Sequence, residues 1–252
     1  MKLSTWTETY KITSYLVNLR QQAGLYSILN LIQDVGWQHA IQLGISLPKN
    51  QGWVFTRQKL LMHEWPKWNQ NVTIKTWLRP PSKDGIFFLR DYELYVNDLK
   101  IGECTSTFAV FDMLTRKMVS PDLSTFKNIW SEEKVLAHHP EKIILNSDVV
   151  TLAQFQVRNS DIDSNNHVNN TKYAQWILDA LPIETLRAGA SLYEYEVNFL
   201  AETKIGDQIS VQKTNQEITE GINSVIQFQG IKSSDGKPAF AAKLKVTQPS
   251  KS

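Results

Sequence analysis

The chain has 252 residues, of which 42% are apolar and 21% charged, and this composition excludes a disordered protein. Its 27 Lys and Arg residues nearly balance 25 Asp and Glu residues, so the net charge of +2 excludes a global field that would draw it to nucleic acid or an anionic membrane. The single cysteine, Cys104, excludes an intrachain disulfide and a cysteine-cluster metal site.

The N-terminal residues, MKLSTWTETYKITSYLV, contain no continuous apolar stretch of signal-peptide length. No later segment approaches the roughly 18 apolar residues that are needed to cross a bilayer. We therefore predict a soluble, cytoplasmic protein without membrane insertion.

The first half of the chain predicts one helix followed by four strands. Apolar residues recur at helical spacing from Leu25 to Ile32, within a predicted helix over residues 23–44 that Gly44 can end. Four runs that are rich in β-branched and aromatic side chains follow, and they predict strands at residues 53–63, 71–78, 86–96 and 102–112.

The stretch 113–150 contains Pro121, Pro140 and a charged SEEK segment, which favour a connection over a regular element. We place the linker itself at residues 126–150, between a unit at 1–125 and a unit at 151–252.

The second half repeats the pattern of the first. Apolar residues predict a helix over residues 169–181, and Pro182 prevents its continuation. In addition, WNQNVTIK (68–75) aligns with IGDQISVQ (205–212). The predicted strands lie at residues 192–200, 208–214, 223–232 and 239–247.

A twisted antiparallel sheet can wrap an amphipathic helix and cover most of its apolar stripe. The repeated order of one helix and four strands therefore predicts an α+β fold of the tandem, or double, hotdog type. The pattern alone also allows two separate α+β domains.

The segment SDIDSNNHVNNTKYAQW (160–176) concentrates short polar side chains ahead of the second helix. Asp163, Asn165 and His167 alternate, so in an extended loop all three side chains point to one side. His167 can exchange a proton near neutral pH, Asn165 can donate to an oxyanion, and Asp163 can orient its neighbours. The alternative is that these residues only cap the helix, as Asn, Asp and Ser commonly do.

The same loop supplies backbone donors. The N–H groups of Val168, Asn169 and Asn170 lie at the start of the predicted helix, where such groups lack intrahelical partners and favour negative charge. We therefore predict an oxyanion site at Val168 and Asn169.

Residues 160–182 resemble the signature of the acyl-ACP thioesterases, the plant plastid enzymes and their bacterial relatives, which runs DxDxNxHVNNxKYxxWxLE and then a small residue and proline. The match departs from this signature at Asp179, which replaces the glutamate. A second segment, FDMLTRKMVSPD (111–122), resembles the family's segment around TRR. The matching residues are Asp161, Asp163, Asn165, His167, Val168, Asn169, Asn170, Lys172, Tyr173, Trp176, Leu178 and Pro182.

This resemblance implies a tandem hotdog fold, with catalysis in the second copy and the acyl chain held largely by the first. In the family, a glutamate followed by a cysteine comes after the catalytic helix. The corresponding VNFLAET (197–203) offers Glu202 and Thr203, so the cysteine is absent. A directly attacking water is then the better hypothesis, with Glu202 as general base aided by Asp163 and His167. The alternative for Glu202 is an exposed carboxylate at a strand end.

Other residues point to no further chemistry. His39, His138 and His139 have no second ligand type at metal spacing, so we predict no metal and no cofactor. The first copy's counterpart of the loop, SYLVNLRQQAG (14–24), contains neither Asp nor His, so we expect a single active site.

We therefore expect a fatty acyl-ACP thioesterase, with an acyl-CoA thioesterase of the same fold, or a non-catalytic acyl- or lipid-binding protein, as alternatives. The expected partner is acyl carrier protein, and the chain is expected to act as a monomer (an internal pseudo-dimer) or as a homodimer. Because acyl carrier proteins are acidic, a basic docking face is expected. Its candidates are Arg57, Lys59, Lys67, Lys83, Arg116 and Lys117.

Overall fold

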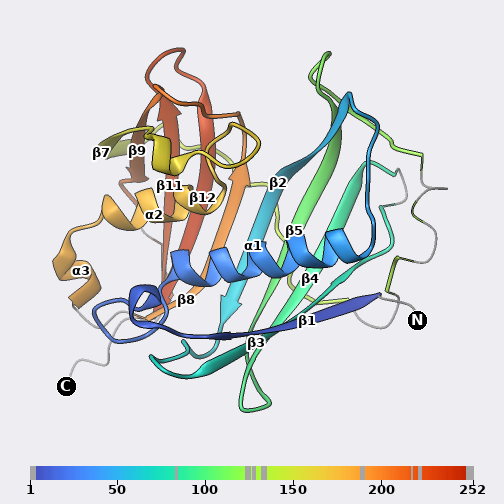
Figure 1. Cartoon of the computed structure of the whole chain (residues 1–252). Coiled ribbons are helices and arrows are strands. Elements are labelled where there is room, and N and C mark those ends of the chain that lie inside the picture. The colour runs from blue at the N-terminus through green and yellow to red at the C-terminus, as the bar shows by residue number, and fades with distance from the viewer. Residues whose placement is uncertain are drawn as a thin grey trace. The chain divides into compact units, whose positions relative to one another are not determined.

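The computed structural model describes residues 4–82, 85–122, 126, 129–131, 135–187, 191–216, 218–220 and 223–247. The chain divides into two compact units, Met1–Pro140 and Glu141–Ser252, which we call the first and second unit. The division falls inside the crossover predicted at residues 126–150. Each unit is α+β and contains an antiparallel sheet (Figure 1).

In the first unit, the sheet order is β1-β3-β4-β5-β2, and β6 pairs with β5. The helix α1 follows β1 in the chain and precedes the other strands. The described elements are β1 (Thr5–Lys11), the 3-10 turn η1 (Ser14–Leu16), α1 (Leu25–Gln42), β2 (Gln51–Met62), β3 (Asn71–Leu78), β4 (Phe87–Val96), β5 (Leu99–Asp112) and β6 (Lys117–Val119).

In the second unit, the sheet order is β7-β9-β11-β12-β8, and β10 pairs with β11. The described elements are β7 (Val149–Gln156), the 3-10 turn η3 (Asn159–Asp161), α2 (Thr171–Asp179), α3 (Ile183–Arg187), β8 (Ser191–Phe199), β9 (Gln208–Thr214), β10 (Ile218–Glu220), β11 (Asn223–Lys232) and β12 (Pro238–Thr247).

The two sheets have the same order when each is read from its first strand, which confirms the predicted repetition. Both predicted helices and all eight predicted strands are present, with ends that differ by a few residues. The first strand of each unit, β1 and β7, was not predicted. Both lie at a sheet edge and alternate between exposed and half-buried residues, so they lack the strong apolar pattern of a strand in the core.

The long helix α1 lies against the inner face of β4. A Cβ atom on Gly36 would lie 2.7 Å from the hydroxyl oxygen of Tyr92, so the absence of a side chain permits this approach. One turn later, His39 Nδ1 lies 2.7 Å from Arg90 Nη1, and both residues are buried. Arginine has no hydrogen-bond acceptor, so Arg90 donates this bond. His39 Nδ1 therefore accepts it and carries no proton.

The shorter helix α2 packs on β8 and β12 through aromatic rings. The ring centroid of Tyr173 lies 5.5 Å from that of Phe199 and 5.3 Å from that of Phe240. Trp176 stacks on Phe155 of β7 at 6.2 Å. These contacts are of the kind that aromatic pairs favour, and they fix the start of α2 relative to the end of β8.

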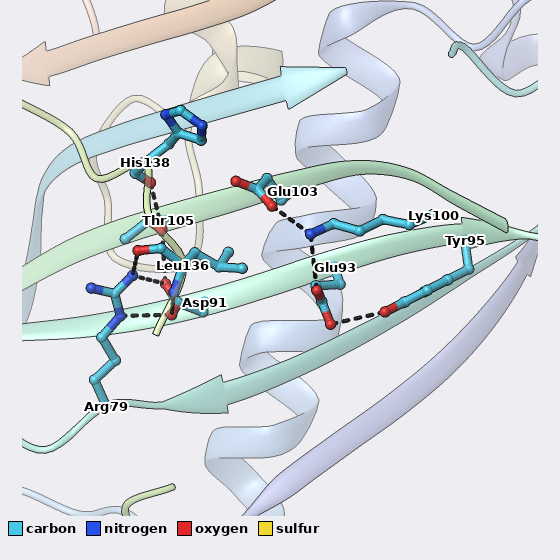
Figure 2. Close-up of polar contacts among 9 residues, drawn as sticks. All are labelled: Arg79, Asp91, Glu93, Tyr95, Lys100, Glu103, Thr105, Leu136 and His138. Carbon is cyan, nitrogen blue, oxygen red and sulfur yellow. Dashed lines mark hydrogen bonds and ion pairs between the residues drawn. The ribbon is translucent and has the colours of Figure 1, made fainter. Parts of the chain in front are cut away.

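The crossover is held by side chains of the first unit's sheet, as Figure 2 shows. Asp91, fully buried, accepts from Arg79 Nε at 2.6 Å and from Nη2 at 2.8 Å. The same two side chains bind the backbone of Leu136, whose N–H donates to Asp91 and whose carbonyl accepts from Arg79. The Thr105 hydroxyl donates to Asp91 Oδ1 at 2.7 Å, and the same oxygen lies 3.2 Å from the His138 carbonyl oxygen. These bonds attach residues 135–138 to strands β4 and β5 of the first unit's sheet.

The second unit holds its own part of the crossover in a similar way. Asn198 on β8 accepts from the Ile143 N–H at 2.8 Å and donates to the Glu141 carbonyl at 2.9 Å. Among the described residues, no helix has the length and apolar character that a membrane span requires.

Candidate active site

The loop between β7 and α2 folds into a tight turn, which corrects the expectation of an extended segment. The Asp163 N–H donates to the His167 carbonyl at 2.8 Å, and the Asn166 N–H donates to the Asp163 carbonyl at 3.1 Å. Asn166 has a φ of 62°, a left-handed conformation that Asn tolerates well. Asp163, Asn165 and His167 therefore converge because the chain curls around Asp163, and not because they alternate along a strand.

The Asp163 carboxylate organises this turn. Its Oδ1 accepts from the Asn165 N–H at 2.8 Å and more weakly from the His167 N–H at 3.4 Å. The Asn165 side-chain nitrogen lies 3.5 Å from Asp163 Oδ2, at the limit of a hydrogen bond, and Asn165 is exposed. The amide of Asn165 is thus on the surface of the loop and only weakly engaged.

Glu202 reaches the same place from the segment that follows β8. Its Oε2 lies 3.4 Å from His167 Nε2, and the two side chains are 37% and 26% exposed. Lys204 Nζ lies 4.0 Å from the same carboxylate oxygen. The Val168 N–H donates to the Thr203 carbonyl at 3.0 Å, and this backbone bond joins the two segments. The structure therefore brings Asp163, His167 and Glu202 together.

The backbone donors differ from the sequence prediction. The Val168 N–H is bound to the Thr203 carbonyl, and the Asn169 N–H donates to the Asp161 carbonyl at 2.8 Å. Both N–H groups already donate to a backbone carbonyl, so neither is available to bind an oxyanion in this conformation. The Asn169 side chain stabilises the turn ahead of α2, because its Oδ1 accepts from the N–H and the hydroxyl of Thr171, each at 3.0 Å. The N-cap of α2 is Asn170, whose side chain forms no capping bond within the described residues.

The first unit contains a second loop with the same backbone bonds. The Asn18 N–H donates to the Gln22 carbonyl at 2.8 Å, and the Gln21 N–H donates to the Asn18 carbonyl at 3.0 Å. Gln21 is left-handed, with a φ of 56°. Farther along, the Ala23 N–H donates to the Pro66 carbonyl at 2.8 Å, as Val168 does to Thr203. The loop architecture is therefore a property of both units.

The side chains at matching places differ. The Asn18 side chain accepts from the backbone of Arg20 at 2.9 Å and of Gln22 at 3.4 Å, in the way that Asp163 accepts from Asn165 and His167. The first unit thus has Asn, Arg and Gln where the second has Asp, Asn and His. Trp65, which precedes Pro66, stands where Glu202 precedes Thr203. Only the second loop carries an imidazole and carboxylates.

Sequence reasoning treated Asp161 only as a motif residue, and the structure gives it a supporting position. Asp161 is 7% exposed, and its carboxylate accepts from the Arg158 N–H at 2.9 Å. Lys172 Nζ on α2 lies 3.6 Å from the other carboxylate oxygen. Asp161 therefore ties the loop to the helix. In the sequence, Asp161 and Lys172 lie on either side of the predicted helix start, and these opposite charges were the signal that could have predicted the contact.

Among the described residues, no group of three or more His, Cys, Asp or Glu side chains has the geometry to hold a metal ion. Of the predicted basic residues, Lys67, Arg116 and Lys117 are exposed, whereas Arg57 and Lys59 on β2 are half-buried. Lys83 lies outside the described residues.

Comparison with known proteins matches both halves of the chain. Residues 4–124 match the acyl-ACP thioesterase N-terminal domain, and residues 145–244 match the acyl-ACP thioesterase C-terminal domain. A palmitoyl-acyl carrier protein thioesterase from Gossypium hirsutum is 25% identical over 240 residues, which are 84% of this chain and 56% of the relative. The chain spans about half the length of the curated relatives that it matches.

Solved structures show the same fold. An acyl-ACP thioesterase from Bacteroides thetaiotaomicron superposes with a TM-score of 0.83 at 23% identity and covers 96% of this chain and 98% of its own. A 12:0-ACP thioesterase from Umbellularia californica superposes with a TM-score of 0.85 at 18% identity and covers 99% of this chain and 96% of its own.

Proposed function

The chain belongs to the acyl-ACP thioesterase family, and on this premise we propose that it hydrolyses the thioester of a fatty acyl chain carried by acyl carrier protein, releasing free fatty acid. The observation that carries the proposal is the contact between His167 Nε2 and Glu202 Oε2 at 3.4 Å. This contact joins a base and an imidazole beside the Asp163 turn, in the one unit whose loop retains these groups.

The proposed architecture is a tandem hotdog. The identical strand orders and the matching loop bonds of the two units support a duplicated ancestor. We propose that the unit at 1–125 accommodates the acyl chain, that residues 126–150 connect the units, and that the unit at 151–252 is catalytic.

In the proposed reaction, Glu202 takes a proton from a water molecule while the water oxygen attacks the thioester carbonyl carbon. The C–O bond forms, the carbonyl electrons move to oxygen, and their return breaks the C–S bond. The proton returns to the sulfur of the departing phosphopantetheine arm, with His167 as its nearest carrier. Asp163 holds the backbone of His167, and the products are a carboxylic acid and a thiol.

The developing oxyanion needs a donor, and the engaged amides of Val168 and Asn169 do not supply it. We assign this role to the side-chain amide of Asn165, which is exposed and only weakly bonded. The N–H of Asn170 at the start of α2 donates to no group in the described part of the chain, and it adds the positive end of the helix dipole. A single donor of this kind contributes on the order of 3 kcal/mol to transition-state stabilisation.

A cysteine nucleophile has no support. Thr203 occupies the place where the family carries cysteine, and among the described residues its buried hydroxyl oxygen has no hydrogen-bond partner that could take its proton. Cys104 lies in β5 of the first unit, fully buried, and burial raises the pKa of its thiol well above the ordinary value. Because the thiolate is the nucleophilic form, Cys104 is inert at neutral pH.

The test compares substrates and variants. The protein is incubated with acyl-ACP and with acyl-CoA of matched chain lengths, and the released thiol is measured. We expect release from ACP with little from CoA, and a loss of about 100-fold in kcat for Glu202→Gln. The matched control is Glu64→Gln, an exposed carboxylate at the equivalent turn of the first unit, which should retain full activity.

Three outcomes would contradict parts of this proposal. Preferential hydrolysis of acyl-CoA would make the chain an acyl-CoA thioesterase of the same fold. Binding of acyl-ACP without thiol release would make it an acyl-binding protein. Unchanged kcat in Glu202→Gln would remove the general base from the mechanism.

We propose acyl carrier protein as the partner, in a complex that exposed Lys67, Arg116 and Lys117 would favour by their charge. Affinity should then fall as ionic strength rises. The sequence also predicts a cytoplasmic protein that acts as a monomer or homodimer and binds no nucleic acid, and these three points stay predictions. The Gossypium hirsutum relative is named as chloroplastic.

A further inference from the structure

The first unit exposes large apolar and basic side chains around its own copy of the loop, which lies between β1 and α1 (Figure 1). The set, which we call the loop surface, comprises three apolar and three basic residues: Tyr15, Leu19, Trp68, Lys11, Arg20 and Lys67. The three apolar residues are 82%, 63% and 57% exposed, in that order. Apolar side chains that are exposed together, with a polar rim, mark interaction sites.

Backbone bonds hold together the segments that carry the loop surface. The Trp68 N–H donates to the Gln21 carbonyl at 2.8 Å, which joins the tip of the loop to the segment after β2. The Asn69 N–H donates to the Ile12 carbonyl at 2.8 Å, which joins the same segment to the end of β1. The exposed residues of these segments are therefore neighbours on one face of the first unit.

The catalytic loop of the second unit has a different surface on the same scaffold. With the two loops aligned by their matching backbone bonds, the places of Tyr15, Leu19 and Arg20 are taken by small polar residues: Ser160, Ser164 and Asn165. The side chain of Asn18 suffices to close the first loop, so its fold does not need these larger side chains. Because they are exposed, they also add little packing, and their presence favours a role in binding.

The chemistry of the loop surface suits an acidic protein. Residues 11–22 and 63–70 contain three Lys or Arg residues and one acidic residue, Glu64. Protein interfaces combine an apolar centre, rich in aromatic residues and arginine, with a polar rim. Acyl carrier proteins are acidic, so their charge complements this face. A membrane fits less well, because segments that bind anionic lipid carry about four to eight Lys or Arg residues.

We infer that the loop surface is a docking site for acyl carrier protein, with Leu19 and Trp68 as its apolar centre and Arg20 and Lys67 as its charged contacts. The inference rests on the proposed function and assigns the face that binds the protein part of the substrate. None of these residues belongs to the catalytic loop, so their loss weakens binding and leaves the chemical step intact.

The test measures binding without turnover. Fluorescently labelled holo-acyl carrier protein is titrated with the enzyme, and its anisotropy gives the affinity at low and high ionic strength. We expect Trp68→Ala to weaken binding about tenfold, as for a central aromatic contact. The double variant Arg20→Glu, Lys67→Glu should weaken it about tenfold at low salt and reduce its dependence on salt.

Kinetics give a second readout. In each variant, KM for acyl-ACP should rise with kcat unchanged, because only binding of the carrier is lost. Hydrolysis of an acyl-pantetheine thioester, which lacks the protein, should stay at the wild-type rate. Thermal melting checks that the variants fold, which is expected because backbone groups and Asn18 hold the loop.

The matched controls lie away from the loop surface. Ile41→Ala removes an apolar side chain, 62% exposed, from the last turn of α1, about 24 Å along the helix from its start beside the loop. Arg187→Glu reverses the charge of a side chain that is 66% exposed on α3 of the second unit. Both variants should bind the carrier within about twofold of the wild type.

The outcomes separate this inference from the proposed function. Unchanged affinity in Trp68→Ala and in the double variant would overturn the docking site, and so would an equal loss in the two controls. Binding of the wild type to vesicles of phosphatidylglycerol but not to the carrier would assign the surface to a membrane instead and also overturn it. A carrier that binds with the expected losses, but whose acyl thioester is never cleaved, would refute the thioesterase activity and support the docking site.

Discussion

Asp163→Asn separates the structural role of Asp163 from its chemical role. The Asp163 carboxylate accepts from two backbone N–H groups at 2.8 and 3.4 Å. In the first unit, the Asn18 amide oxygen accepts from the equivalent groups at 2.9 and 3.4 Å. One amide oxygen is thus sufficient to build this turn. The substitution should keep the loop and remove only its negative charge.

The magnitude follows from these bonds. The 3.4 Å contact is weak, so the short bond to Asn165 carries most of the difference between a charged and a neutral acceptor, about 1 kcal/mol. For a chain of this size, that loss lowers the thermal midpoint by about 2–4 °C. The loss of the orienting charge beside His167 should reduce kcat by about 100-fold. Circular dichroism melting and thiol release from acyl-ACP measure the two effects.

The reciprocal variant, Asn18→Asp, is the control. It places a carboxylate in a loop without a histidine, so it should fold normally and leave kcat unchanged. If Asp163→Asn unfolded the protein or lowered its stability by several kcal/mol, the correspondence between the two loops would be wrong. If it folded and kept full kcat, Asp163 would have no part in catalysis.

Asp91→Asn should lower the free energy of unfolding by about 3–5 kcal/mol in urea titrations, because it leaves buried Arg79 without its carboxylate; a loss under about 1 kcal/mol would contradict this. Gly230→Ala should cost about 1–3 kcal/mol in the same assay, since the new Cβ would lie 2.0 Å from Phe240 Cε1, and an unchanged midpoint would show that the ring yields freely. Burial raises the pKa of Asp179, so folding is favoured while this carboxyl group is protonated, and that contribution to stability is lost as pH rises and the group ionises. Asp179→Asn should therefore raise the melting temperature at pH 7 and leave it unchanged at pH 3. A higher melting temperature at pH 3 alone would refute this.

Much of the fold could be predicted because its elements have strong local patterns. The helices α1 and α2 and the strands of the sheet interiors bury regular apolar faces, which the sequence displays directly. The edge strands β1 and β7 bury little, and their patterns are correspondingly weak. The predicted alignment of residue 68 with residue 205 also agrees with the structure, where Pro66 and Thr203 accept equivalent backbone bonds.

The site was predictable in its composition and less so in its geometry. Asp163, His167 and Glu202 could be named because their residue types and the family signature mark them. The engagement of the Val168 amide could not, since its acceptor is the Thr203 carbonyl of another segment. The left-handed turn at Asn166 and the bond from Asn169 to Asp161 are local, but they follow no periodic pattern of residue types. Long-range backbone bonds leave no periodic trace in a sequence.

The duplicated loop shows why a family signature and a capping motif can coincide in one segment. The backbone scaffold is the same in both units, and one amide side chain, Asn18, suffices to close it in the first. The second unit uses an aspartate at that position and adds His167 and Glu202, which the scaffold does not need. Since a cap requires no imidazole and no carboxylate from another segment, the contact between His167 and Glu202 favours the proposed catalytic role of this loop over a role in capping alone.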